Sequence, residues 1–123
     1  MAEPAFLLDS NICIYVLGDA ASAAAIRLSE CVPGSAVTSA IVYAELLRKA
    51  PEAADFEAFF GVVPVLPFDG AAARAYAAIP FKRGTFDRLI GAHALSRGLV
   101  LVTNNVRDYD DIPGLRLENW IEA

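Results

Sequence analysis

Residues 5–11 read Ala-Phe-Leu-Leu-Asp-Ser-Asn, a short apolar run that changes abruptly to polar side chains. An apolar run of this length, bounded by a polar turn, predicts a buried strand over Ala5–Leu8. Ser10 is a favourable helix N-cap and Gly18 a favourable helix end, so a helix is expected to follow. With Ser10 as the cap, Asp9 is left at the carboxyl end of the strand, where it can point into a crevice.

Residues 99–105, Leu-Val-Leu-Val-Thr-Asn-Asn, repeat this pattern near the other end of the chain. They predict a buried strand over Leu99–Val102 that ends at Thr103. Helical and strand-like segments alternate between the two stretches, which predicts an α/β sandwich around a mainly parallel sheet. In such sheets, chemistry collects beyond the carboxyl ends of the strands. Further helices are expected over residues 20–30, from a cap at Thr38 or Ser39 to Lys49, from Pro51 to Phe60, from a cap at Asp69 to about Ala78, and over Phe86–Arg97 before Gly98; further strands are expected at 36–37, at the edge over 62–66, and near 115–117.

The chain of 123 residues is expected to form one domain, residues 1–123, without repeats or linkers. Hydrophobic residues make up 56% of it, and the mean hydropathy is +0.44. The longest apolar stretch, Phe59–Phe68, is broken by a glycine and two prolines and is too short to span a bilayer. Glu3 stands where a secretory signal carries Lys or Arg. We therefore expect a cytoplasmic protein, whose apolar excess serves a two-sided sheet and a partner-facing surface.

The net charge of −5 and the isoelectric point near 4.7 are not typical of nucleic-acid binding. A nuclease of this composition requires acids that cluster around a divalent cation, because the cation inverts the local charge. Cys13 and Cys31 have no metal-ligand spacing, and buried free thiols are expected for a chain without an export signal.

Three acids have competing structural and functional interpretations. Asp9 could serve only as an N-cap. Glu45 lies on the polar strip of its helix and could be a solvated acid paired with Lys49. Asp87 could merely favour the dipole of its helix from the first turn. However, Asp87 shares a face with apolar residues, an unusual place for an acid unless a positive group meets it. The residue pattern alone leaves these alternatives open.

The remaining candidates for function are weaker. His93 is expected at the edge of the core rather than in catalysis. Lys82 and Arg83 lie shortly before Asp87 and could hold a phosphate backbone near the acids. The basic residues are spread thinly, and most of them are expected to be solvated: Arg48, Lys49, Lys82, Arg83, Arg88, Arg97 and Arg107.

Four segments together resemble a known family. They are Leu7-Leu8-Asp9-Ser10-Asn11-Ile12, Tyr43-Ala44-Glu45-Leu46, Phe86-Asp87-Arg88-Leu89-Ile90-Gly91-Ala92-His93-Ala94-Leu95, and Leu101–Tyr109 with Pro113-Gly114-Leu115 and Asn119-Trp120 behind it. In order and spacing they resemble the VapC-type PIN-domain toxins of bacterial VapBC toxin–antitoxin pairs, over nearly the whole chain. The resemblance implies a PIN fold, in which a central parallel sheet is flanked by helices and acids from distant segments converge in one pocket.

The resemblance also implies a site. Asp9, Glu45 and Asp87 become the metal-binding carboxylates, and Ser10 and Asn11 orient them or the scissile phosphate. Mg²⁺, or Mn²⁺ in its place, is the expected cofactor, because these hard cations prefer carboxylate and water oxygens. Such ions activate a water for attack on a phosphodiester, so no protein nucleophile is needed.

The fourth acidic position of the family is where this chain departs from the pattern. That acid often lies just after the strand that ends at Thr103, where this chain has Asn104 and Asn105. The first carboxylate beyond them is Asp108. We expect Asp108 to act in catalysis as a weak fourth ligand or through the other ligands, assisted by Asn105. In the same segment Tyr109 and Ile112 are expected to pack inward, and Asp110 and Asp111 to be solvated.

The function that the resemblance implies is that of a toxin, an endoribonuclease that cleaves cellular RNA and is neutralised by a VapB-type antitoxin. Self-association into a dimer or a toxin–antitoxin hetero-oligomer is also implied. The alternatives are a housekeeping RNA-processing PIN nuclease and an inactive PIN module that only binds a partner. The short chain favours the toxin over the first, and the three acids argue against the second. A phosphotransferase with a nucleophilic aspartate normally needs a second acid two residues later, where this chain has Asn11.

Overall fold

The sheet places the carboxyl ends of all its strands at one edge. The computed structural model describes residues 2–49, 56–82 and 86–121. Within them, five strands form one sheet in the order β3-β2-β1-β4-β5, and every pairing is parallel. The strands are β1 (Phe6–Leu8), β2 (Ala36–Ser39), β3 (Val65–Leu66), β4 (Val100–Val102) and β5 (Leu117–Glu118). The predicted α/β architecture with a parallel sheet is therefore confirmed.

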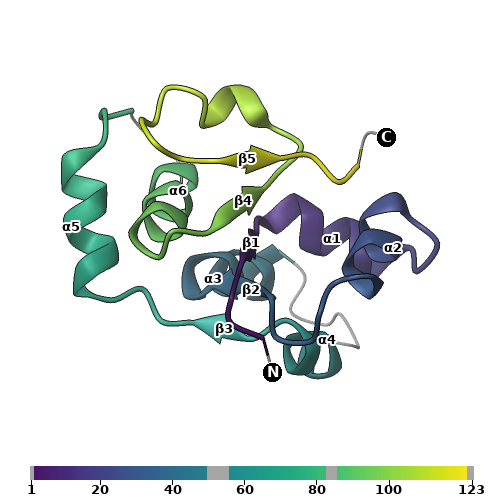
Figure 1. The fold of residues 1–123 in the computed structure, drawn as a ribbon. Helices are drawn as coiled ribbons and strands as arrows, with labels where there is room; N and C mark the ends of the chain where they lie inside the picture. The colour runs from purple at the N-terminus through teal and green to yellow at the C-terminus, as the bar shows by residue number, and fades with distance from the viewer. Residues whose placement is uncertain (1, 50–55, 83–85, 122–123) are drawn as a thin grey trace.

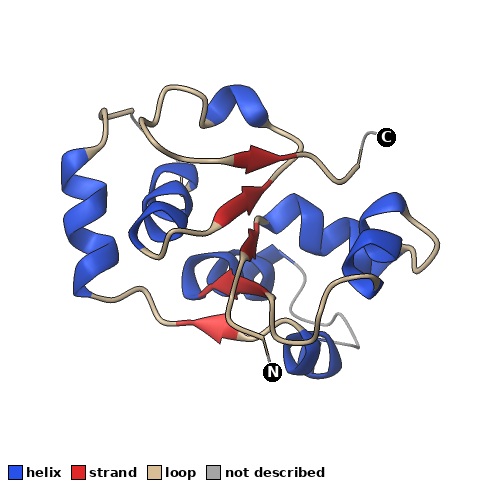
Figure 2. Cartoon of the chain, in the orientation of Figure 1, coloured by secondary structure: helices blue, strands red, loops and turns tan. Residues whose placement is uncertain are grey.

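Helices cover both faces of this sheet. In Figure 1, α5 and α6 lie on one side of the strands and α1 and α2 on the other, and Figure 2 shows how short the strands are beside the helices. Among the described residues, no single helix is long and apolar enough to cross a membrane; only α1 and α2 taken together, bent by 93°, reach that length and apolarity. The helices are α1 (Ser10–Gly18), α2 (Ala23–Ser29), α3 (Ala40–Lys49), α4 (Phe56–Val62), α5 (Gly70–Ala78) and α6 (Asp87–Ser96), followed by a 3₁₀ turn over Val106–Asp108.

The central strand β1 can be covered on both faces because its residues are apolar. Leu7 and Leu8 are both fully buried, as expected for a strand covered on two faces. In register, Leu8 pairs with Val102 of β4. The residues that follow, Asp9 and Thr103, therefore leave the sheet side by side. This register brings together two polar segments that are far apart in the sequence.

Several elements differ from prediction at their ends. The helix expected over 20–30 begins only at Ala23, because Ser22 caps it by accepting the Ala25 N–H at 3.1 Å. The strand expected over 62–66 keeps only Val65–Leu66, since α4 extends through Val62, but it does lie at the edge. The last strand is Leu117–Glu118 rather than 115–117. The helix start expected at Pro51 lies outside the described residues.

Other predictions are confirmed. Asp69 caps α5 through the Ala72 N–H at 3.0 Å. Gly98 follows α6 with φ at +66°, a conformation that favours glycine. Cys13 and Cys31 are free thiols as predicted, but only Cys13 is buried, and Cys31 is partly exposed. The position of His93 differs from the prediction: it lies inside the core rather than at its edge, fully buried, with Nδ1 2.7 Å from Ser39 Oγ.

Candidate active site

The three acids singled out in the sequence line one pocket. Its volume is about 210 Å³. Asp9 comes from the carboxyl end of β1, Glu45 from the middle of α3, and Asp87 from the first turn of α6. The described residues that line it are Asp9, Ser10, Asn11, Glu45, Lys49, Asp87 and Asn105. Distant segments thus bring three carboxylates and one amine to the carboxyl edge of the sheet.

Asp9 both caps a helix and faces the pocket. Its backbone is extended, and its Oδ1 accepts the Ile12 N–H at 3.0 Å, so Asp9, not Ser10 as predicted, is the N-cap of α1. The Thr103 hydroxyl also donates a hydrogen bond to the carboxylate. A carboxylate has about four acceptor positions, so these two donors leave capacity on the pocket side. The structural and functional interpretations of Asp9 are therefore compatible.

The Asp9 carboxylate carries negative charge in a place that disfavours it. Only 5% of the residue is exposed. Burial, followed by repulsion from Asp87 and Glu45, raises its pKa from 3.8 to about 6, and the hydrogen bonds from Thr103 and Ile12 only partly oppose this. A cation in the pocket would compensate this charge.

Ser10 orients Glu45. Because Asp9 takes the capping position, the Ser10 hydroxyl is available to donate to Glu45 Oε1 at 2.8 Å. Lys49 Nζ lies 3.7 Å from Glu45 Oε2, so the predicted pairing one helical turn away is present. However, the Glu45 side chain is only 14% exposed, and it is not a solvated surface acid. Both of its oxygens are held in place at the wall of the pocket.

Asp87 is oriented by a residue that the sequence did not assign to the site. Tyr109, 1% exposed, donates its hydroxyl to Asp87 Oδ1 at 3.1 Å. Burial, and then the negative charges of Asp108 and Glu45, raise the pKa of Asp87. The sequence predicted that Tyr109 packs inward, which is confirmed, but its hydroxyl partner lies 22 residues away and left no local signal.

A buried arginine holds the segment after β4 against α6. Arg88 was among the basic residues assigned to solvated surface, yet it is 2% exposed. Its Nη2 lies 2.6 Å from Asp111 Oδ1, so Asp111 is not the solvated acid that was predicted either. Lys82 also pairs with Asp111, at 3.4 Å, rather than facing the acids. Arg83 lies outside the described residues.

The same segment places the remaining predicted residues at the rim of the pocket. Asn105 lines the pocket and donates its backbone N–H to Thr103 Oγ1 at 3.0 Å. Asn104 Oδ1 accepts from Asn11 Nδ2 at 3.4 Å. Asp108 is exposed and lines a neighbouring hollow, but it reaches Asp87 both through its charge and through a hydrogen bond between the two side chains.

The donor set fits a hard divalent cation, but the acids are not gathered into a ready-made coordination sphere. In the described parts of the chain, no three His, Cys, Asp or Glu side chains approach closely enough to form a metal site as they stand. The Ser10 and Tyr109 hydroxyls hold Glu45 and Asp87 individually. Mg²⁺ retains several waters and is usually held by one or two carboxylates, so a pocket wider than a closed cage suits it.

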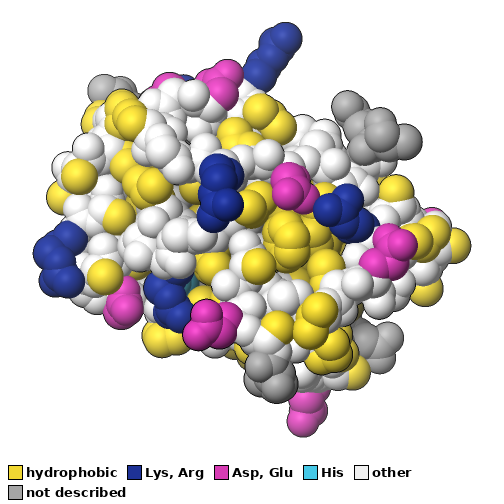
Figure 3. Space-filling model, viewed as in Figure 1, with side chains coloured by type: hydrophobic (Ala, Val, Ile, Leu, Met, Phe, Trp, Pro, Cys, Tyr) yellow, Lys and Arg dark blue, Asp and Glu magenta, His cyan; other side chains and the backbone are white. Residues whose placement is uncertain are grey.

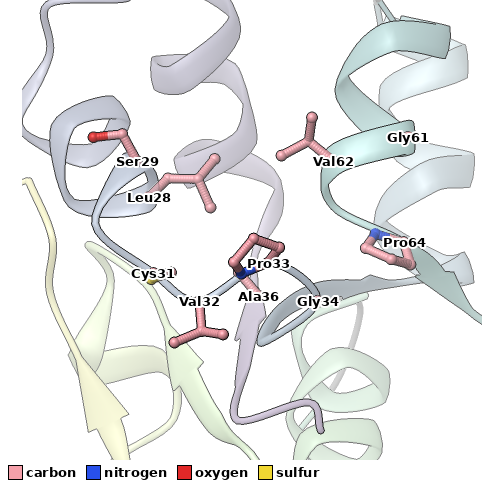
Figure 4. Close-up of a pocket in the computed structure, with 10 residues that line it drawn as sticks. All are labelled: Leu28, Ser29, Cys31, Val32, Pro33, Gly34, Ala36, Gly61, Val62 and Pro64. Atoms are coloured by element: carbon pink, nitrogen blue, oxygen red, sulfur yellow. The ribbon is translucent and has the colours of Figure 1, made fainter. Parts of the chain in front are cut away.

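A larger hollow at the other end of the sheet lacks such groups. It measures about 380 Å³ and lies between the end of α2, the start of β2 and the end of α4. Figure 4 shows its largely aliphatic lining, with Cys31 as the one titratable side chain. Burial raises the pKa of that thiol. On the face shown in Figure 3, basic side chains are scattered among acidic and hydrophobic ones and form no continuous patch. The acidic pocket is thus the stronger candidate for chemistry.

Comparison with known proteins identifies the family. Residues 6–115 match the family described as PIN domain. The chain is 33% identical over 129 residues to the tRNA(fMet)-specific endonuclease VapC of Shigella flexneri, across 94% of this chain and 97% of the relative. It is 35% identical to the VapC endonuclease of the same name from Salmonella typhimurium, with the same coverage.

This chain is a PIN domain of the VapC family.

The solved structures agree with this assignment of the PIN domain. The DNA-bound VapBC complex of Salmonella typhimurium matches with a TM-score of 0.84 and 32% identity, over 95% of this chain and 98% of that one. VapBC2 of Rickettsia felis, bound to a promoter DNA fragment, matches with a TM-score of 0.82 and 26% identity, over 94% and 98%. The PIN fold expected from the four motifs is confirmed.

Proposed function

We propose that this PIN domain is the toxin of a VapBC pair, a Mg²⁺- or Mn²⁺-dependent endoribonuclease that hydrolyses phosphodiester bonds in cellular RNA. The observation that carries the proposal is the convergence of Asp9, Glu45 and Asp87 in one pocket. Full-length similarity to proteins named as VapC ribonucleases supports it. A phosphodiester can enter an acidic pocket of this kind only with a cation, because the acids would otherwise repel it.

In this proposal, the three carboxylates hold the cation and their neighbours orient them. The bound cation supplies an activated water and stabilises charge on the phosphate. Asp9 is held by the Ile12 N–H and by Thr103, Glu45 by Ser10 and Lys49, and Asp87 by Tyr109. Such partners of metal ligands typically contribute tenfold to a hundredfold to metal affinity or activity.

Polar side chains at the rim complete the site. Asn11 and Asn105 line the pocket without charge and are placed to donate hydrogen bonds to phosphate oxygens. Asn104 holds Asn11. Asp108 acts as a weak fourth ligand or through Asp87, which it reaches by its charge and by a side-chain hydrogen bond. The RNA segment that enters is single-stranded or a loop, because there the backbone is free to bend into the pocket and the bases are unstacked.

The partner is a VapB-type antitoxin, and the cytoplasm, where RNA and antitoxin meet, is the place of action. The similar Salmonella and Rickettsia structures are toxin–antitoxin complexes on DNA. Ile14 and Tyr15 on α1 and Leu47 on α3 are exposed by 42%, 45% and 41%. Such apolar side chains offer an interface for the antitoxin or for a second copy of the toxin. We propose that both contacts form, giving a hetero-oligomer built on toxin dimers.

RNA cleavage by purified, antitoxin-free protein tests the nuclease. Total RNA is incubated with the protein in Mn²⁺, and in Mn²⁺ with excess EDTA. Fragments are expected only where the cation is available. Fragments that appear equally in EDTA would rule out the metal mechanism.

Growth arrest on expression tests the toxin role and the site together. Asp9→Asn and Asp87→Asn remove a charged ligand at nearly constant volume, and each is expected to relieve the arrest. Asp110→Asn is a matched control, because Asp110 is exposed and lies outside the pocket lining. If folded Asp9→Asn and Asp87→Asn proteins arrest growth as wild type does, the site is elsewhere.

A further inference from the structure

A second hollow adjoins the acidic pocket and has a different chemistry. It measures about 410 Å³ and is lined by Asn104, Asn105, Val106, Arg107, Asp108 and Asn119. Asn105 lines both cavities, so they meet at this residue. The Asn11–Asn104 hydrogen bond, at 3.4 Å, also joins a wall of one to a wall of the other. A ligand that occupies the acidic pocket can therefore extend into this hollow without leaving the protein surface.

The hollow is built by the ends of two neighbouring strands. Asn104 and Asn105 follow β4 closely, and Asn119 directly follows β5. The strands are paired in parallel, and the Thr103 N–H donates to the Glu118 carbonyl at 2.9 Å. The side chains of the hollow thus extend from the same sheet edge as Asp9, where α/β folds bind their ligands.

The charges of the two cavities differ in a way that separates their ligands. Among the residues that the structure describes, the acidic pocket has three carboxylates against one amine, whereas the second hollow has one acid, Asp108, and one base, Arg107. A balanced site favours neither a metal ion nor a phosphate. Its three carboxamides carry both hydrogen-bond donors and acceptors, and the oxygens of Asn104 and Asn119 each already accept one bond, from Asn11 Nδ2 and from the Ile121 N–H. This combination suits a neutral group with a mixed donor and acceptor edge.

Two further side chains favour a planar ring as that group. Val106 is 38% exposed and offers an apolar surface to the face of a ring. Arg107 is exposed and forms no ion pair with any residue in the described ranges, so its guanidinium is available to stack or to donate hydrogen bonds. Unpaired bases of single-stranded RNA are recognised through such contacts on their faces and edges.

We infer that this second hollow binds an unpaired nucleobase of the nucleotide next to the scissile phosphate, and that it sets the base preference of cleavage at that position. The inference rests on the proposed RNA cleavage at the acidic pocket and adds the recognition of sequence to it. With the phosphate at the acids, the adjoining nucleotide reaches Asn105, and its base enters the hollow beyond.

Abasic RNA tests this subsite directly. Short single-stranded RNAs carry one abasic nucleotide at each position in turn, so the backbone is kept and one base is removed. Cleavage is measured in Mn²⁺, and binding is measured by fluorescence anisotropy with Ca²⁺ in its place. We expect one position, adjacent to the cut, at which base removal weakens both cleavage and binding by about tenfold, the scale of one well-formed amide or guanidinium contact to a base.

Variants locate the effect. In Arg107→Ala and Asn119→Ala, removing the base at that position should cost less cleavage and less binding than it costs in wild type. RNA that keeps all its bases should still be cut by both variants. Arg74→Ala on α5 is the matched control, because it removes an exposed arginine that lines neither cavity, and its penalty should equal that of wild type. Thermal melts of each variant show whether the fold is kept. Arg107→Ala is expected to disturb the fold less than Asn119→Ala, because Arg107 is exposed on the surface.

The outcomes separate the two proposals. Equal binding of intact and abasic RNA by wild type would overturn the subsite, and so would a penalty that persists undiminished in both variants. Base discrimination in binding without any cleavage would support the subsite and contradict the nuclease. Cleavage without any base discrimination would do the reverse.

Discussion

At the scale of single residues, the site depends on acids that are unfavourable to the fold until a cation compensates them. Asp9 shows this most clearly. Its folded pKa of about 6 exceeds the ordinary 3.8, mainly because of burial. The folded chain therefore holds this proton more tightly than the unfolded chain does. By linkage, stability is lost as the pH rises through this interval, and the loss is complete above about pH 6.

Asp9→Asn should remove that loss. The carboxamide oxygen can still accept the Ile12 N–H, so the helix cap remains. In EDTA, the free energy of unfolding of wild type relative to the variant should fall between pH 3 and pH 7 by about 3 kcal/mol, from about two pKa units. Urea unfolding at a series of pH values measures the difference. A difference that stays constant with pH would show that burial of Asp9 does not disfavour its charge.

Tyr109→Phe isolates the hydroxyl that holds Asp87. The ring still packs beside Gly91, so the free energy of unfolding should fall by only about 1 kcal/mol, the contribution of one hydrogen bond. Mn²⁺ affinity should fall about tenfold, because Asp87 loses the donor that orients it. Titration calorimetry measures the affinity, and Tyr15→Phe, an exposed hydroxyl on α1, is the control. Unchanged Mn²⁺ affinity would reduce Tyr109 to a packing residue.

At the scale of elements, the sequence predicted the positions of the strands better than it predicted the helix caps and the side-chain contacts between distant segments. The apolar runs before Asp9 and Thr103 predicted β1 and β4 correctly, because a buried parallel strand needs consecutive apolar residues. The cap of α1 was assigned to the wrong residue because Asp and Ser cap equally well. Arg88 was misplaced because its partner Asp111 lies 23 residues away, and periodicity carries no information about such pairs.

The segment that contains Tyr109 and Ile112 packs against α6 at Gly91. A Cβ at position 91 would lie 2.9 Å from Ile112 Cδ1 and 3.2 Å from Tyr109 Cδ1. Gly91→Ala should therefore destabilise the protein by roughly 1–2 kcal/mol, despite the better helix propensity of alanine. It should also weaken Mn²⁺ binding, since Tyr109 shifts away from Asp87.

A matched control separates packing from helix propensity. At Gly61 in α4, an added Cβ would meet no atom within 4 Å, so Gly61→Ala should stabilise the protein by about 0.5–1 kcal/mol. Chemical denaturation of both variants gives the comparison. If Gly91→Ala were as stabilising as Gly61→Ala, the close approach of the last segment to α6 would not constrain the fold.

At the scale of the whole molecule, the cation links function to stability. Three acids meet at the carboxyl edge of the sheet: Asp9 lies between β1 and α1, Glu45 in α3 and Asp87 in α6. Without a cation, the repulsion among these acids acts on three helices at once. A cation that binds only the folded chain adds stability that grows with the logarithm of its concentration above the Kd. Metal binding should thus strengthen the packing of the helices around the pocket as well as enable catalysis.

Thermal melts of wild type and Asp87→Asn, each in EDTA and in saturating Mn²⁺, test this link. In EDTA, Asp87→Asn should melt higher than wild type, because it removes a carboxylate whose pKa is raised by burial and by nearby negative charges. The carboxamide can still accept the Tyr109 hydroxyl, so that contact is not the variable. In Mn²⁺, the melting temperature of wild type should rise more than that of the variant. The difference between the two melting temperatures should therefore become smaller or change sign. A metal-free variant that melts below wild type would mean that Asp87 stabilises the start of α6 through the helix dipole, and that its place in the pocket is incidental.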